Sequence, residues 1–175
     1  MVPDLNRLSR EDLIALIQMY AKNWLAHDGC WFLAIEKAYG FQKAIELDTE
    51  SWCSFTAIEA RRIMDTMSIP KNGGLDSLAK ALDYRLYASV NHQKIERVSE
   101  DRLIFKMLDC RVQSTRRCKG FLDFPCKPVG LVEYGGFADA VDPRIQTRCL
   151  GCPPDVPRED FYCAWEFTIR ELGYQ

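Results

Sequence analysis

The sequence has few of the features that mark membrane, secreted or nucleic-acid-binding proteins. Its longest fully apolar run extends only from Cys30 to Ile35, which is far too short to span a bilayer. The residues after Met1 carry charge early and contain no apolar stretch of the kind found in secretory signals. The formal net charge is only -2, so a polyanion is not expected as the main partner. We therefore expect a cytoplasmic protein that binds neither a membrane nor nucleic acid.

Histidine is scarce, with two residues in the chain, whereas cysteine is abundant, with eight. In the cytoplasm, cysteines are more often metal ligands or reduced thiols than disulfides. Four of them fall close together in the second half of the sequence: Cys126, Cys149, Cys152 and Cys163. The inner two form a Cys-x2-Cys pair, in which Gly151 permits the tight turn that brings two thiolates onto one ion. We interpret the four cysteines as ligands of one structural metal ion and expect zinc.

Two other interpretations of these cysteines remain open. Cysteine is also a small buried hydrophobe, so the four residues can be free structural thiols. The chain has one Cys-x2-Cys pair rather than the two of a typical four-cysteine zinc site, and the sequence Cys152-Pro153 is compatible with an iron–sulfur cluster or a redox pair. The sequence alone leaves these alternatives beside zinc.

The first half of the chain has the hydrophobic period of helices. Ser9 is expected to cap a helix whose apolar residues recur through Trp31 to Ile35. Gly29 predicts a bend or break in this helix, and Gly40 predicts its C-terminal cap.

Further helices are expected up to residue 90. Residues 44–47 predict a short linking turn or helix, and Asp48 predicts the cap of the next helix, which Pro70 ends. Residues 71–74 contain two glycines and predict a flexible joint, after which leucines at helical spacing predict a third helix from Leu75.

The hydrophobic period then changes to two, which is typical of strands. Residues 93–98 and 102–112 predict a β-hairpin. Residues 128–141 predict an inserted helix, and residues 144–150 and 161–170 predict two further strands. The expected fold class is α+β, with an N-terminal helical layer packed on an antiparallel sheet that has one inserted helix and a four-cysteine metal staple.

This pattern is interpreted as one domain. Residues 1–175 form the domain, residues 1–70 a helical extension or layer, and residues 75–175 an α+β metal-binding core.

Two family resemblances bear on these expectations. The spacing of Cys126, Cys149, Cys152 and Cys163 resembles the zinc site of the four-vinyl-reductase-type domain, the sensor module of aromatic-responsive transcriptional activators. Those sensors have a glutamate at the position of Cys149. The segments 23–29 and 59–63 look like an uncharacterised prokaryotic family related to L-2-amino-thiazoline-4-carboxylic acid hydrolase. The resemblances imply an α+β fold and a zinc ion. They do not imply the activity of either family, because one fold can carry different functions.

Aromatic residues at helical spacing predict a small-molecule pocket between the first two long helices. Tryptophans, one imidazole and one carboxylate on facing helices suit a small aromatic or apolar ligand held by a few polar groups. The residues expected to line it are Trp24, His27, Trp31, Trp52, Glu59 and Tyr134. The alternative is that these side chains belong to an ordinary hydrophobic core.

Three functions compete on this basis. The first is a sensor-like zinc-binding module that binds a small molecule, either as a homodimer or with an effector on a separate chain. The second is a hydrolase that opens a C–N or C–S bond with Cys30 or Cys110 as nucleophile, with His27 near Cys30 as its base. The third is an iron–sulfur or thiol redox protein. Whether the chain is an enzyme is left open.

A basic segment offers one more hypothesis. Arg111, Gln113, Arg116 and Arg117 carry the forked donors that bind a carboxylate or phosphate, although arginines in such a segment are more often simply solvated.

Overall fold

The computed structural model describes residues 4–155 and 160–169 of the chain. It divides into two compact units, Met1–Ala44 and Ile45–Gln175. The division falls inside a helix, between Ala44 and Ile45, and not at the glycine-containing joint near residue 71. Arg170, the last residue of the final predicted strand, lies outside the described residues.

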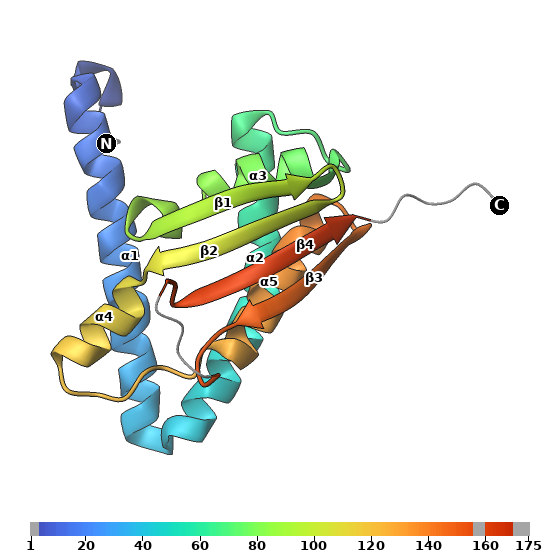
Figure 1. The fold of residues 1–175 in the computed structure, drawn as a ribbon. Helices are drawn as coiled ribbons and strands as arrows, with labels where there is room; N and C mark the ends of the chain where they lie inside the picture. The colour runs from blue at the N-terminus through green and yellow to red at the C-terminus, as the bar shows by residue number, and fades with distance from the viewer. Residues whose placement is uncertain (1–3, 156–159, 170–175) are drawn as a thin grey trace. The chain divides into compact units, whose positions relative to one another are not determined.

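The first unit is almost entirely one long helix, α1 (Arg10–Tyr39), preceded by a short 3-10 turn (Figure 1). The predicted cap is confirmed, because the Ser9 hydroxyl accepts a hydrogen bond from the Asp12 backbone N–H at 3.0 Å. The predicted C-terminal cap is also confirmed: Gly40 has a φ of 88°, and its N–H donates to the Glu36 carbonyl at 2.8 Å. The expected break at Gly29 is wrong, since α1 continues through it.

The next helix, α2 (Phe41–Met67), begins directly after Gly40. Residues 44–47, predicted as a short linking turn or helix, are helical but belong to α2 itself, so the predicted cap at Asp48 is wrong. Gly40, the one residue between α1 and α2, has a positive φ, a backbone conformation that glycine adopts readily.

The second unit contains the sheet and the remaining helices. In chain order its elements after α2 are α3 (Gly74–Asp83), a 3-10 turn (Leu86–Ser89), β1 (His92–Ser99), β2 (Arg102–Asp109), α4 (Arg111–Cys118), α5 (Lys127–Val141), β3 (Ile145–Gly151) and β4 (Cys163–Ile169). The strands form one antiparallel sheet in the order β1-β2-β4-β3. The fold is α+β, and the predicted hairpin, inserted helix and two final strands are confirmed. The predicted strand 102–112 ends early, at Asp109, because α4 begins at Arg111.

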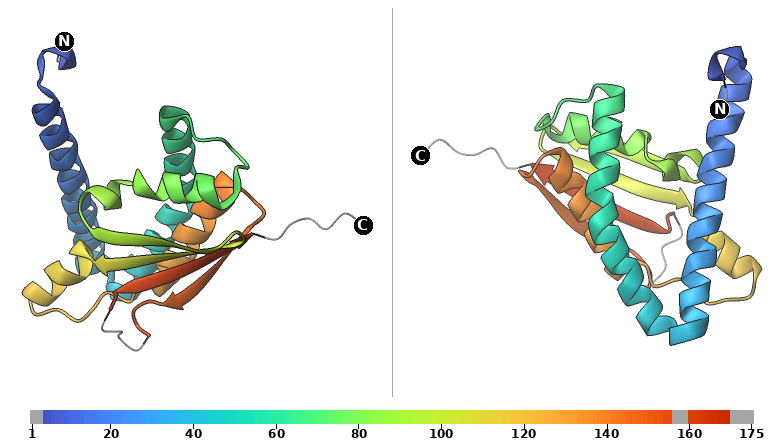
Figure 2. Two further views of the ribbon diagram at one scale, coloured as in Figure 1. Left: turned by 45° about the horizontal axis from the view of Figure 1, so that its top comes forward. Right: turned by 180° about the vertical axis from the view of Figure 1, so that it is seen from behind.

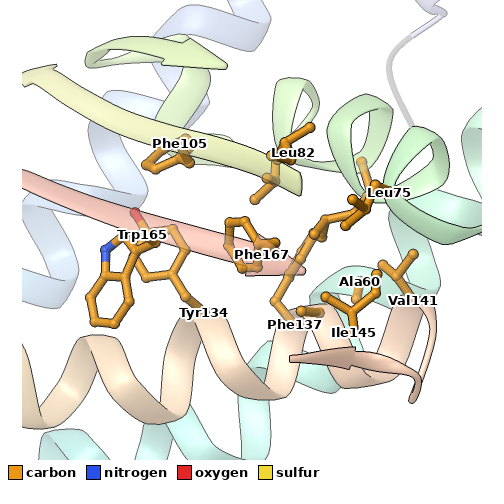
Figure 3. Packing of buried hydrophobic residues seen from close by; sticks show 14 of the residues in the cluster. Ala60, Leu75, Leu82, Phe105, Tyr134, Phe137, Val141, Ile145, Trp165 and Phe167 are labelled. Atoms are coloured by element: carbon orange, nitrogen blue, oxygen red, sulfur yellow. The ribbon is translucent and has the colours of Figure 1, made fainter. Parts of the chain in front are cut away.

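One face of this sheet is covered by α2, α3 and α5 (Figure 2). The side chains that point to this face alternate along the strands, as the period of two requires. Leu103, Phe105 and Met107 on β2 face the helices and are at most 3% exposed. Trp165 and Phe167 on β4 lie beside them and pack with Tyr134 and Phe137 of α5 (Figure 3). This core positions α5 closely on the inner face of the sheet.

Glycine at one position allows that close approach. A Cβ at Gly130 of α5 would lie 2.5 Å from Cζ2 of Trp165, a distance that atoms of neighbouring side chains do not reach. By contrast, a Cβ at Gly135 of the same helix would meet no atom within 4 Å. Gly130 therefore permits α5 and β4 to pack against each other through the Trp165 ring.

The opposite face of the sheet is charged. Glu166 of β4 lies between two arginines of neighbouring strands, with Oε2 paired to Arg102 and Oε1 accepting from Arg148 Nε at 2.8 Å. Although it points away from the core, Glu166 is only 6% exposed because the two arginines cover it.

None of the helices in the described ranges is both long and apolar enough to cross a bilayer.

Candidate functional site

The four cysteines of the predicted metal site come from the elements that meet at one end of the sheet. Cys126 is the N-cap residue of α5, and Cys152 directly follows β3. Cys149 of β3 pairs with Trp165, while Cys163 is the first residue of β4. The inward alternation of β3 and β4 places both strand cysteines on the face that α5 covers. All four sulfur-bearing residues belong to, or pack against, the hydrophobic core.

Two of these sulfurs are in contact. Cys126 Sγ lies 3.6 Å from Cys152 Sγ. This hydrogen bond lowers the pKa of Cys126, against the opposing effect of burial. Hydrogen bonding to Cys126 and Cys163 raises the pKa of Cys152. Burial raises the pKa of Cys149, and Cys163 adds to this effect as a neighbouring group. Cys126, Cys149, Cys152 and Cys163 are here called the cysteine cluster, in which Cys126 and Cys152 are in sulfur–sulfur contact.

The side-chain amide of Gln113, on α4, hydrogen-bonds to Cys126. Gln113 is 0% exposed, and its Oε1 accepts a hydrogen bond from the Phe124 N–H at 2.8 Å. Its Nε2 donates to the Phe124 carbonyl at 2.8 Å and to Cys126 Sγ at 3.4 Å. Gln113 therefore holds the segment that delivers Cys126 and also contacts its sulfur.

The Cys-x2-Cys pair is tied to the start of α5. Lys127 Nζ donates to both carboxylate oxygens of Asp155 at 2.9 Å, and the Lys127 N–H donates to the Pro153 carbonyl at 2.9 Å. Asp155 in turn accepts from the Cys152 N–H at 3.3 Å. The pairing with Lys127 lowers the pKa of Asp155. Asp155 thus acts as a turn residue that joins the two segments.

The chemistry of this donor set suits zinc, although the structure itself shows no metal centre. Within residues 4–155 and 160–169, no three side chains of histidine, cysteine, aspartate or glutamate converge as the ligands of an ion. No disulfide joins the cysteines either, since all eight are free. The 3.6 Å contact between Cys126 and Cys152 is close to the sulfur–sulfur separation of about 3.8 Å that a tetrahedral site with Zn–S bonds of about 2.3 Å requires.

Of the two cysteines predicted as nucleophiles, Cys30 is on α1 in the other unit, whereas Cys110 lies near Cys126 and Cys163 and packs against the core. Cys30 and His27 are both on α1 and both exposed. Cys110, the N-cap residue of α4, is half-buried, and burial raises its pKa to about 12. At neutral pH Cys110 is therefore a thiol and not the thiolate that nucleophilic attack needs.

A second cluster in the same unit is built around Arg85. Arg85 is 2% exposed and is held between two acidic side chains, one from α2 and one from α5. Its Nη2 lies 2.8 Å from Glu59 Oε2, and its Nη1 lies 2.8 Å from Glu133 Oε1. Burial lowers the pKa of Arg85, but Glu133 and Glu59 outweigh this effect and raise it overall. The guanidinium is therefore permanently charged.

Aromatic rings enclose the Arg85 guanidinium. Its carbon lies 4.9–5.8 Å from the centroids of four rings: Trp52, Tyr87, Tyr134 and Phe137. Trp52 stacks on Tyr87 at 5.7 Å, and Tyr134 stacks on Trp165 at 4.8 Å. We call Arg85, Glu59, Glu133 and these four rings the Arg85 cluster. One positive and two negative groups give it a formal charge of -1 in a nearly dry environment.

The predicted pocket residues fall into two groups. Trp52, Glu59 and Tyr134 meet in the Arg85 cluster. Trp24, His27 and Trp31 belong to α1 in the other unit. A pocket that combines both groups stays a prediction. Arg85 itself was not identified from the sequence; the available signal was a charged residue between Leu82 and Leu86 in a strongly apolar helical pattern.

The basic segment is engaged in local contacts. Arg117 donates to both oxygens of Asp123, at 2.8 and 2.7 Å, and stacks on the Tyr162 ring. Arg116 donates to the Leu122 carbonyl at 2.9 Å and packs on the Phe121 ring. These contacts give both arginines a structural role in holding the loop between α4 and α5.

The fold and the two clusters define an α+β domain with a buried thiol group and a buried ion-pair network. One family model matches residues 6–169 of the chain. The chain belongs to this family, DUF6125, which is described as a family of unknown function. No curated protein matches the chain significantly. The family description names no metal, ligand or reaction, so the resemblances to thiazoline hydrolase and to four-vinyl-reductase-type domains stay predictions.

Proposed function

We propose that this chain is a zinc-binding domain in which Cys126, Cys149, Cys152 and Cys163 hold one structural ion. The observation that carries the proposal is the contact of 3.6 Å between Cys126 Sγ and Cys152 Sγ. Free thiols at this distance are already near the separation of about 3.8 Å that two ligands of a tetrahedral zinc ion adopt. Zinc binding would draw Cys149 and Cys163, which lie on adjacent strands, onto this pair.

A four-thiolate site supports a structural role rather than a catalytic one. Catalytic zinc sites keep one position open for water or substrate, whereas four protein ligands close the coordination sphere. The ion would join the N-terminus of α5 to the ends of β3 and β4. Because such a site exists only in the folded chain, its binding free energy contributes directly to folding.

The test compares two cysteine variants with the wild-type protein. Cys126→Ser removes a proposed ligand, and Cys118→Ser, at the exposed end of α4, is the matched control. We expect Cys126→Ser to lose its zinc and to melt at a lower temperature, and Cys118→Ser to keep both zinc content and Tm. Full retention of zinc by Cys126→Ser would contradict the four-cysteine site. Retention of zinc together with loss of a hydrolytic activity would instead favour the catalytic alternative.

A second proposal is that the Arg85 cluster contributes to a binding site for a small aromatic molecule with a hydrogen-bond donor. Glu59 Oε1 is buried and has no hydrogen-bond partner among the described residues. Buried carboxylate oxygens normally accept hydrogen bonds, and the formal charge of -1 favours a donor that carries positive charge. Trp52 and Tyr87, whose ring centroids lie 5.8 and 5.4 Å from the Arg85 guanidinium carbon, supply flat apolar surfaces in the same cluster.

This proposal is tested by thermal shift with small aromatic amines such as benzylamine. We expect the wild-type Tm to rise with amine concentration and the Glu59→Gln protein to respond less. A toluene series without the amine separates ring burial from the hydrogen bond. Equal responses of wild type and Glu59→Gln would show that the cluster does not bind these amines.

A further inference from the structure

The fully buried Gln113 makes contacts that a loop anchor alone does not require. A primary amide has two N–H donors and one carbonyl acceptor, and all three are directed at residues 124–126. Oε1 and one Nε2 donor bridge the backbone N–H and carbonyl of Phe124, both at 2.8 Å. The second Nε2 donor points to Cys126 Sγ at 3.4 Å. The bridge to Phe124 already fixes the amide plane, so the donor to sulfur is held in a defined direction.

A four-thiolate zinc site needs such donors. One Zn²⁺ and four thiolates carry a net charge of -2, and burying an uncompensated charge is costly. Cys126 is half-buried and Cys152 is buried, so solvent supplies few hydrogen bonds to this part of the cluster. An N–H group that donates to a thiolate delocalises the negative charge of the sulfur and fixes the orientation of the sulfur lone pairs. Residues in this position typically change metal affinity by about 10–100-fold when they are replaced.

We propose that Gln113 is a positioning residue of the metal site, whose amide donates to the Cys126 thiolate and orients it toward the ion. This inference rests on the proposed zinc site. It assigns a function to α4, since that helix carries Gln113 and holds the amide in the core beside the start of α5. The Gln113 Nε2 donor lies 3.4 Å from Cys126 Sγ, a distance that suits a sulfur acceptor better than an oxygen acceptor. The donor therefore favours a thiolate at position 126 over a serine or carboxylate ligand.

The first experiment measures zinc affinity for two matched variants, with a chromogenic chelator as competitor. Gln113→Met removes the amide and keeps the side-chain length. Gln93→Met is the control, because the Gln93 amide donates to the Leu82 carbonyl at 3.1 Å, away from the cysteines. We expect Gln113→Met to raise the zinc Kd by about 10–100-fold and to shift the sulfur-to-metal absorption band of the Co²⁺-loaded protein. Gln93→Met should leave both unchanged.

A purely structural role for Gln113 predicts a different result. Loss of the loop anchor alone would lower the Tm of Gln113→Met while the Co²⁺ band and the zinc Kd stay at their wild-type values, and this outcome would overturn the inference. A wild-type protein that binds no zinc would overturn the proposed function as well. Zinc binding by wild type with an unaffected Gln113→Met protein would overturn the positioning role alone.

A measurement on the unmodified protein covers the case in which Gln113→Met does not fold. In protein loaded with ¹¹³Cd²⁺ and labelled with ¹⁵N, a hydrogen bond from the amide to a metal-bound sulfur transmits a scalar coupling between the metal and the amide proton. We expect this coupling for one Nε2 proton of Gln113 and not for those of Gln93. Its absence from Gln113 would overturn the proposal.

Discussion

Replacing Arg85 with methionine should destabilise the protein severely. The substitution keeps most of the apolar contact with the surrounding rings, but it leaves the carboxylates of Glu59 and Glu133 without their shared partner. Both ion-pair distances are 2.8 Å, and the carboxylate side chains are 7% and 10% exposed, so solvent screens the pair weakly. Breaking a buried ion pair by removing one partner costs about 3–5 kcal/mol. This is a large part of the total stability of about 5–15 kcal/mol that is typical of a folded protein.

The expected change is measured by urea unfolding and by calorimetry. A loss of about 3–5 kcal/mol corresponds to a decrease in Tm of about 6–20 °C for a chain of this size. The triple variant Arg85→Met, Glu59→Gln, Glu133→Gln removes all three charges and should recover most of the loss, because the cost comes from unpaired charge and not from packing. A loss below about 1 kcal/mol for the single variant, or a triple variant no more stable than the single one, would refute this reasoning.

Three further predictions concern packing, pH and thiol reactivity. Gly130→Ala places a methyl group 2.5 Å from a buried indole carbon and should cost about 1–3 kcal/mol in urea unfolding, whereas Gly135→Ala meets no atom and should be neutral or stabilising by up to about 1 kcal/mol. Hydrogen bonding from an adjacent arginine lowers the pKa of Asp142. The Asp142 carboxylate therefore contributes stability above the unfolded pKa of about 3.9, and this contribution is lost as the pH falls below that value. Asp142→Asn should therefore flatten the decrease in Tm between about pH 5 and 3. Parallel Tm curves for the wild-type and Asp142→Asn proteins would contradict this. Native thiol labelling at pH 7 should be fast at exposed Cys118 and slow at Cys110, whose pKa is about 12; rapid labelling of Cys110 would restore it as a nucleophile.

Periodicity in the sequence predicts much of the second unit. The change from helical period to alternation near residue 92 gives the β1–β2 hairpin, and the same alternation gives β3 and β4. These predictions succeed because one face of the sheet is buried, so each strand must alternate. The sequence does not predict helix α4, because its only buried residue is the polar Gln113 and its remaining positions, apart from Val112 and Cys118, are polar or basic. A hydrophobic pattern cannot identify a helix that is held in place by an amide and by local arginine contacts.

The candidate sites were predicted unevenly for a related reason. Cysteine spacing predicts that Cys126, Cys149, Cys152 and Cys163 share one ion; the structure brings Cys126 and Cys152 into contact across 26 positions of the chain, and the metal site stays a prediction. The Arg85 cluster depends on three segments that are distant in sequence, and each contributes one charged residue that looks solvent-exposed on its own. Helical spacing predicts that Trp52 and Glu59 line one small-molecule pocket, but nothing local indicates that Arg85 lies between them and α5.

The central claim is that the cysteine cluster holds one structural zinc ion. Elemental analysis of untagged protein purified without oxygen, together with its absorption spectrum, tests it most directly. One zinc per chain with no visible absorption band is the expected result. Iron with a visible band would replace the structural-zinc proposal by electron transfer or redox sensing. Protein that contains no metal, and that takes up no zinc when zinc is added under reducing conditions, would contradict the claim and leave the four cysteines as free thiols.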